Sequence, residues 1–246
     1  MNMLRAGKIS KTLKSNLPDG FRGVFKISVV GSTGSGKTAF MKKVLGNLFE
    51  AQSDVNRRSS TENQIDSTHT WFRVGKKKSD TQSTTTLSIN SAGILLVKTL
   101  FNSIEFHATS AVDEILQRDD IDEIYKLNFF DNAGQERFDF MPEITMRGSD
   151  AVIIIVDGTN MSSVGKINYF LELVNIEENR KESKIPIIVL LNKADLMDHG
   201  CYIGLNNIKH ILGFQADFHE TSMITGKGVD DSIRSLVSHL HERSKT

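Results

Sequence analysis

The strongest chemical signal in the chain is a glycine-rich turn that ends in a lysine and a threonine. Residues 31–38 read Gly-Ser-Thr-Gly-Ser-Gly-Lys-Thr, which has the Walker A form GxxxxGK[ST]. Glycines in such a turn let backbone N–H groups curl around phosphate oxygens, at the positive end of the following helix. Lys37 can then reach the β- and γ-phosphates, and Thr38 can offer its hydroxyl to Mg²⁺. The turn therefore predicts a site for nucleotide phosphates.

A second chemical signal is Asn-Lys-Ala-Asp at residues 192–195, directly after an apolar run. An aspartate in this place can accept hydrogen bonds from both the N1–H and the exocyclic amine of guanine, a pair of donors that adenine does not offer. Read alone, the four residues also fit a solvated turn at the end of a strand. Together with the glycine-rich turn, they indicate a preference for guanine nucleotides.

Residues 131–136, Asp-Asn-Ala-Gly-Gln-Glu, form a third and weaker signal. An Asp-x-x-Gly pattern arises about once by chance in a chain of this composition. Its value lies in its context, because it follows a predicted strand and lies between the other two motifs. The order of the three motifs therefore carries more weight than the third motif alone.

Apolar periodicity predicts the elements that position these motifs. Predicted strands cover residues 24–30, 87–98, 125–130, 151–157, 186–192 and 215–220. A predicted helix follows the glycine-rich turn, and further helices cover residues 162–180, 205–213 and 229–243. Strands that alternate with helices indicate an α/β fold around a mostly parallel sheet.

Composition limits the classes of protein to consider. The chain has 246 residues, with 30 Lys and Arg against 30 Asp and Glu, and 39% of its residues are hydrophobic. These values allow a sizeable core, and the zero net charge argues against a nucleic-acid partner. The single cysteine, Cys201, excludes an intrachain disulfide. No apolar run is long enough for a bilayer span, and neither terminus offers a lipidation motif, so we expect a cytoplasmic protein without a lipid anchor.

The ordered motifs, followed by Glu-Thr-Ser-Met at residues 220–223, resemble those of the small GTPases of the Ras superfamily. The spelling Asp-Asn-Ala-Gly-Gln-Glu-Arg-Phe at residues 131–138 is most similar to the Rab branch. The resemblance implies a P-loop NTPase G domain, with a six-stranded mixed, mostly parallel sheet flanked by helices on both faces. It also implies a molecular switch that binds GTP and hydrolyses it slowly to GDP and phosphate. Partners would be effector proteins, an exchange factor and a GTPase-activating protein, of the trafficking or signalling kind.

The resemblance also assigns roles to individual residues. The catalytic residues would be Gln135, which orients the attacking water, and Lys37, which balances phosphate charge. Mg²⁺ would be held by Thr38, Thr86 and, through water, Asp131. The nucleotide-binding residues would be Gly31, Ser32, Thr33, Gly34, Ser35, Gly36, Lys37, Thr38, Ala39, Phe49, Thr86, Asp131, Gly134, Asn192, Lys193, Asp195, Ser222 and Met223.

Within the base site, Asn192 would brace the phosphate loop and Lys193 would lie along the purine plane. Asp195 would read guanine, and the backbone amide of Met223 would lie near O6. Phe49 matches an aromatic residue that packs edge-on against guanine, although plain core packing also explains it. Two alternatives stay open at the magnesium-binding threonine. Thr86 begins the apolar alternation of the next strand at the family spacing, and the neighbouring Thr85 is the alternative.

The sequence departs from the family pattern at several places. Thr33 stands where many relatives have glycine, and Met223 and Ile224 replace the small residue and lysine usual in the base-covering loop. The predicted G domain at 24–246 carries insertions at about 50–85 and 103–123. Such polar stretches fit solvated loops, but the Trp-Phe pair at 71–72 indicates packing on the domain or on a partner.

Residues 1–23 form a basic N-terminal extension. It fits either a solvated tail or a weak membrane-surface helix, so peripheral membrane contact is the second interpretation of the localisation. Two alternatives to a GTP-hydrolysing switch remain at this point. One is a guanine-nucleotide-bound scaffold with little hydrolysis. The other is an ATPase or kinase, which residues 192–195 oppose.

Overall fold

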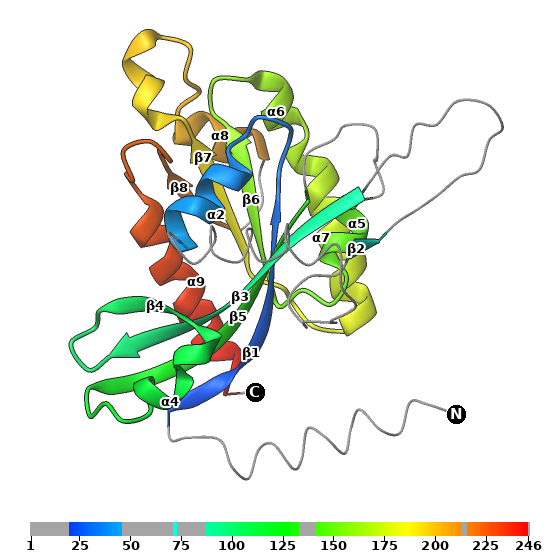
Figure 1. Ribbon diagram of the computed structural model, residues 1–246. Helices are drawn as coiled ribbons and strands as arrows, with labels where there is room; N and C mark the ends of the chain where they lie inside the picture. The colour runs from blue at the N-terminus through cyan, green and yellow to red at the C-terminus, as the bar shows by residue number, and fades with distance from the viewer. Residues whose placement is uncertain (1–19, 46–70, 73–86, 133–140, 213–215, 246) are drawn as a thin grey trace, which may run out of the picture.

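A mixed β-sheet runs through the centre of the molecule and has helices on both faces (Figure 1). The computed structural model describes residues 20–45, 71–72, 87–132, 141–212 and 216–245. The described strands are β1 (Phe21–Val30), β2 (Trp71–Phe72), β3 (Leu87–Thr99), β4 (Ile104–Ala108), β5 (Ile121–Asn132), β6 (Ala151–Asp157), β7 (Ile187–Asn192) and β8 (Asp217–Glu220).

The strand order is β2-β3-β5-β1-β6-β7-β8, and β4 pairs with β3 beside this path. The five strands from β5 to β8 in this order run parallel, whereas β3 runs antiparallel to β5. The predicted mixed, mostly parallel sheet is therefore confirmed. Two short strands, β2 and β4, were not expected, and both pair antiparallel with β3.

Helices make the crossovers that parallel strands require. The described helices are α2 (Lys37–Leu45), α4 (Val112–Ile115), α5 (Met141–Met146), α6 (Met161–Gly165), α7 (Ile167–Lys181), α8 (Leu205–Leu212) and α9 (Val229–Arg243), with the 3-10 turns η3 (Thr109–Ala111) and η4 (Ala194–His199). The single helix predicted for 162–180 is two helices, because Lys166 separates α6 from α7. In the described part of the chain, we find no helix long and apolar enough to cross a bilayer.

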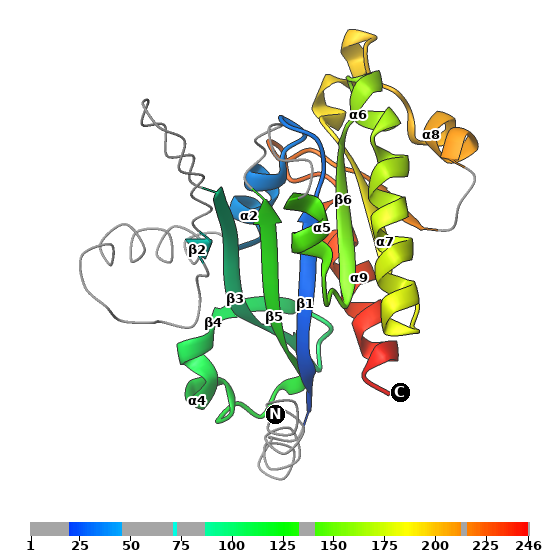
Figure 2. The same cartoon turned by 90° about the vertical axis from the view of Figure 1, so that its right-hand side faces the viewer.

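The two faces of the sheet bury separate apolar cores (Figure 2). On one face, α2 and α9 supply Phe40 and Leu236, which pack against strand residues that include Phe129. On the other face, α7 supplies Phe170 to a core that contains alternate residues of β6. All seven residues of β6 are buried, which explains why this strand reads as an unbroken apolar run in the sequence.

The insertion at 103–123 is folded onto the sheet, so the loop interpretation does not hold there. It forms β4, η3 and α4, which lie at the end of the molecule away from the loop between β1 and α2 (Figures 1 and 2). Ile115 of α4 is 1% exposed and packs with Leu95, Val97 and Ile124 in a third apolar cluster. The insertion therefore covers strand residues that would otherwise face water. Of the insertion at 50–85, only residues 71–72 are described.

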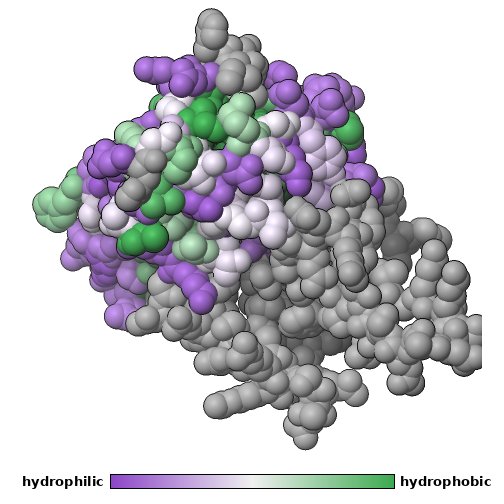
Figure 3. Space-filling model, turned by 90° about the horizontal axis from the view of Figure 1, so that it is seen from above, coloured by the Kyte–Doolittle hydropathy of each residue, from purple (hydrophilic) through white to green (hydrophobic). Residues whose placement is uncertain are grey.

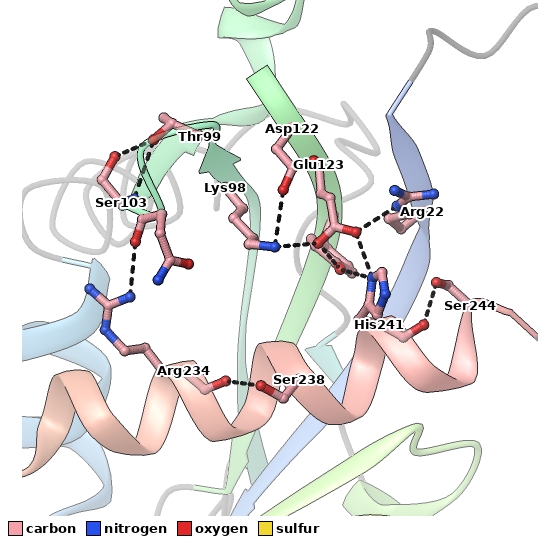
Figure 4. A network of polar contacts seen from close by, with 12 residues as sticks. Arg22, Lys98, Thr99, Ser103, Asp122, Glu123, Arg234, Ser238, His241 and Ser244 are labelled. Atoms are coloured by element: carbon pink, nitrogen blue, oxygen red, sulfur yellow. Dashed lines mark hydrogen bonds and ion pairs between the residues drawn. The ribbon is translucent and has the colours of Figure 1, made fainter. Parts of the chain in front are cut away.

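A buried carboxylate ties several strands together at this same end (Figure 4). Glu123 of β5 is 2% exposed and accepts hydrogen bonds from Arg22 at 2.9 Å and from the Tyr125 hydroxyl at 2.8 Å. Lys98 of β3 and His241 of α9 lie 3.5 and 2.5 Å from its oxygens. Arg22, which the sequence placed in the basic N-terminal extension, therefore belongs to β1 and to the folded domain.

Candidate functional site

The loop between β1 and α2 depends on glycines that no other residue can replace without strain. Gly36 has a φ of +107°, and a Cβ there would lie 2.2 Å from Asn192 Nδ2. A Cβ at Gly31 would lie 2.2 Å from the carbonyl oxygen of Ile155 in β6. The absence of a side chain at both positions therefore lets the loop backbone approach β6 and Asn192 closely.

Lys37 is folded back over the loop that precedes it. Its side chain is 6% exposed, and Nζ donates to the carbonyl oxygens of Gly31 at 2.9 Å and Ser32 at 3.0 Å. Burial lowers the pKa of Lys37 below its usual value of 10.5, and the Asp131 carboxylate acts in the opposite direction. The ammonium group is therefore held inside the loop, where phosphate oxygens can replace its carbonyl partners.

Asp131 and Thr38 present the oxygen ligands that Mg²⁺ prefers. Asp131 is fully buried on β5, and β5 pairs directly with β1 so that Asp131 lies opposite Val29. Thr38 lies exposed in the first turn of α2. The described residues include no cluster of three or more His, Cys, Asp or Glu side chains able to hold a metal. A cation held by one carboxylate, a hydroxyl and substrate phosphates fits this donor set.

Asn192 joins the three segments that the sequence assigns to the nucleotide. The side chain is 4% exposed, and its Nδ2 donates to the carbonyl oxygen of Ser35 at 2.8 Å. Its Oδ1 accepts a hydrogen bond from the backbone N–H of Met223 at 3.2 Å. The phosphate loop, the end of β7 and the segment after β8 are thus fixed relative to one another by one amide group.

The two residues after Asn192 that bear charge are also oriented. Lys193 has a left-handed backbone with a φ of 69°, and its Nζ lies 2.6 Å from Asp157 Oδ2. The Ser222 hydroxyl donates to Asp195 Oδ1 at 2.6 Å, and the N–H of Thr225 donates to the same hydroxyl oxygen at 3.1 Å. Ser222 therefore sets the direction of the Asp195 carboxylate.

Phe49, Thr85, Thr86, Gly134 and Gln135 lie outside the described residues. Their predicted roles stay predictions. Seen from above, the described residues form a surface in which hydrophilic, intermediate and hydrophobic side chains are interspersed (Figure 3).

Sequence reasoning missed two residues that the structure brings to the site. Asp157 contacts Lys193, and Ser163 of α6 lies with its Oγ 2.6 Å from the Ser32 hydroxyl of the phosphate loop. A signal for Asp157 existed, because it is the last residue of one predicted parallel strand and Asn192 is the last residue of the next. The two lie opposite each other in the sheet. Ser163 offered no comparable signal.

Comparison with known proteins identifies the family of the chain. The model of the Ras family matches residues 90–242. The chain is 27% identical to an uncharacterized protein of Saccharomyces cerevisiae over 90% of this chain and 89% of that protein. It is 30% identical to the GTP-binding protein Rit2 of Mus musculus, over 48% of this chain and 53% of Rit2.

The Ras-related protein Rab-4 of Dictyostelium discoideum is 34% identical over 43% of this chain and 50% of its own length. The match thus spans about half the length of Rit2 and Rab-4, and the relatives also include the Ras-like protein rasU of Dictyostelium discoideum, at 25% identity over 50% of this chain and 56% of that protein. Since the family model covers more than half of the chain and the phosphate and base segments meet as described, the chain belongs to the Ras family of small GTPases.

Proposed function

We propose that the protein is a molecular switch that binds GTP and hydrolyses it slowly to GDP and phosphate. The observation that carries the proposal is the position of Asn192, which joins the phosphate loop to the segment at Met223. This contact supports a single nucleotide site, in which Lys37 would lie at the phosphate end and Asp195 at the guanine end. Family membership supports the same function.

Guanine recognition would rest on Asp195, whose carboxylate can accept both donors of the guanine edge. Ser222 prepares this carboxylate by donating to Oδ1. A carboxylate that is already oriented loses less freedom on binding, which favours affinity. The Met223 backbone, held by Asn192, would cover the base.

Hydrolysis would proceed by in-line attack of a water on the γ-phosphate, with no covalent intermediate. Gln135 would orient the water, while Lys37 and the amides of the phosphate loop would stabilise the charge on the phosphate oxygens. Thr38, Thr86 and, through water, Asp131 would hold Mg²⁺, which would supply positive charge to balance the phosphates. The intrinsic rate should be slow, because the loop supplies no arginine of its own.

Two measurements test this function. Calorimetry should show tight binding of GDP and little binding of ADP, and equal affinities would refute guanine specificity. Single-turnover assays on GTP-loaded protein should show slow phosphate release, which Gln135→Leu lowers without changing GDP affinity. If Gln135→Leu hydrolyses GTP as fast as the parent, Gln135 does not position the water.

A guanine-nucleotide-bound scaffold is a second candidate function, favoured by one feature. Thr33 is exposed in the phosphate loop, and its β-branched side chain is stiff at χ1. If it crowds the space beside the γ-phosphate, hydrolysis falls while binding remains. No phosphate release over many hours, with or without a GTPase-activating protein, would favour the scaffold over the switch.

As a switch, the protein would take effector proteins in its GTP-bound state, and an exchange factor and a GTPase-activating protein would control that state. We further propose a cytoplasmic location, with membrane-surface contact through residues 1–23 as the peripheral alternative. A pull-down that compares GDP-loaded with GTP-analogue-loaded protein tests the switch, because effectors should be captured only with the analogue.

A further inference from the structure

Asp157 has no role in the predicted site, yet its carboxylate contacts a residue of the base-binding motif. It is the last residue of β6, is 7% exposed, and lies opposite Asn192 of β7. Its Oδ2 lies 2.6 Å from Lys193 Nζ. A nearly buried carboxylate at this edge of the sheet therefore faces the lysine that would lie along the purine plane.

We propose that Asp157 is a positioning residue that holds Lys193 in the conformation in which its side chain supports the guanine base. The proposal rests on the proposed binding of guanine nucleotides and deepens it. According to this proposal, Asp157 contributes to the affinity for guanine nucleotides although it lies outside the motifs at 31–38, 131–136 and 192–195.

The Asp157 carboxylate is itself held in place. Its Oδ1 accepts hydrogen bonds from the backbone N–H of Thr159 at 3.0 Å and from the Thr159 hydroxyl at 2.7 Å. Oδ2 is thereby directed toward Lys193. Burial works to raise the pKa of Asp157, but the hydrogen bonds from Lys193 and Thr159 outweigh burial and keep the pKa below its usual value. The group therefore remains a carboxylate at neutral pH.

Lys193 needs such a partner because its side chain is long and flexible. Its four-carbon stem rotates about several bonds, and 34% of the side chain is exposed. The left-handed backbone fixes where the stem begins but not where the ammonium group ends. An ion pair at the far end restrains the whole stem before a nucleotide arrives, which reduces the ordering cost of binding.

Asp157 is also linked to the phosphate end of the site. Its backbone N–H donates to Ser163 Oγ at 2.9 Å, and this oxygen lies 2.6 Å from the hydroxyl of Ser32 in the phosphate loop. The end of β6 therefore contacts the phosphate loop through Ser163 and the base-binding motif through Lys193. A displacement of Asp157 is expected to disturb the base end first, because only there does its charge take part.

An ordinary structural ion pair is the competing explanation, and β6 offers a matched control. Asp150 directly precedes β6, and its Oδ1 lies 2.9 Å from Lys181 Nζ. Like Asp157, Asp150 forms an ion pair with one lysine and accepts a hydrogen bond from one backbone N–H, that of Lys26 at 2.8 Å. The pair is partly buried, with side chains 23% and 25% exposed, and it lies at the opposite end of β6 from the predicted site.

The test measures GDP affinity and GDP release for the full chain with Asp157→Asn and with Asp150→Asn. Asparagine keeps an oxygen for Thr159 and removes the charge that holds Lys193. We expect Asp157→Asn to weaken GDP binding about tenfold, mainly through faster release, and Asp150→Asn to leave affinity within about twofold. Thermal unfolding of both variants shows whether each retains the fold.

The decisive measurement repeats Asp157→Asn in a Lys193→Met background. If Asp157 acts through Lys193, its substitution should now change GDP affinity by less than about twofold. Two results would overturn the positioning role. One is that Asp157→Asn still weakens GDP binding tenfold when Lys193→Met is present. The other is that Asp157→Asn alone does not weaken GDP binding. If the parent does not prefer GDP to ADP, the proposed function fails and the positioning role with it. If the parent prefers GDP but the effects of Asp157→Asn and Lys193→Met on GDP affinity are additive, only the positioning role is refuted.

Discussion

The two ends of the central sheet hold carboxylates in different surroundings: at one end Asp195 follows β7, whereas at the other end Glu123 of β5 contacts groups from other strands and from α9. Lys193 and Asp195 belong to the first end, and Asp195 is only partly buried. Glu123 belongs to the second end, is 2% exposed and is surrounded by groups from four elements.

Glu123 and Asp195 differ in their capacity to accept further hydrogen bonds. Glu123 already has donors from β1, β3, β5 and α9, so its charge serves the fold (Figure 4). Asp195 is oriented by Ser222 and remains partly exposed, so it can accept further hydrogen bonds from a ligand. A charged side chain that is oriented by a neighbour but still partly exposed is therefore the better candidate for ligand binding. Substitutions at the two ends should accordingly separate nucleotide affinity from stability.

Asp195→Asn should have the largest effect, on affinity alone. The carboxylate that would accept two guanine donors becomes an amide that repels one of them, and each lost charge-assisted bond costs about 1.5–3 kcal/mol. Binding of GDP should therefore weaken strongly, and binding of xanthosine diphosphate should improve, because xanthine has an oxygen acceptor in place of the guanine amine. Calorimetry with both nucleotides measures this exchange. Unchanged GDP affinity would remove Asp195 from the base site.

Glu123→Gln should have the next largest effect, on stability alone. The neutral amide leaves the charges of Arg22 and Lys98 without their carboxylate, and breaking a buried ion pair by removing one partner costs about 3–5 kcal/mol. Because one side of the network reaches water, with Arg22 38% exposed, we expect about 3 kcal/mol or less. Urea unfolding measures the loss, and GDP affinity of the folded variant should equal that of the parent. A variant as stable as the parent would show that the network does not hold these elements together.

Ile115→Ala should have a smaller effect and tests whether the insertion at 103–123 stabilises the domain. Removing a buried isoleucine side chain costs about 2–5 kcal/mol, and the lower part of this range suits a short helix at the edge of a small cluster. The surface variant Leu116→Ala, at a side chain that is 42% exposed, provides the control and should cost much less. If the two variants lose equal free energy of unfolding, the burial of Ile115 does not stabilise the domain.

The sequence predicts the strands and helices well where apolar periodicity is strong, and it fails where contacts are long-range. The apolar run at 151–157 and the helix at 229–243 match β6 and α9, because each buries a regular face. The fold of the insertion at 103–123 was missed, since its many acidic residues conceal inward side chains such as Ile115. Asp157 was missed because it belongs to no motif, and its contact with Lys193 spans 36 residues.

The smallest predicted effect is the pH dependence that Glu123 contributes. Burial acts to raise the pKa of Glu123, but the hydrogen bond from Tyr125 and the charges of Lys98, His241 and Arg22 outweigh it, so the pKa lies below the usual 4.5. A carboxyl group whose pKa is lower in the folded state binds protons more readily when the chain is unfolded. Its stabilisation is therefore complete above about pH 4.5 and is lost as the pH falls through the folded-state value.

The measurement is the free energy of unfolding of the parent and of Glu123→Gln at a series of pH values between about 7 and 3. Other carboxylates, such as Glu177 and Asp217, also have lowered pKa values and contribute to the acid sensitivity of both proteins. The Glu123 contribution is the difference between the two curves, which should be constant above about pH 5 and should narrow below it. Parallel curves over the whole range would mean that Glu123 has the same pKa in the folded and unfolded chain. In that case the stability lost in Glu123→Gln comes from packing and hydrogen bonding, and not from the charge of the carboxylate.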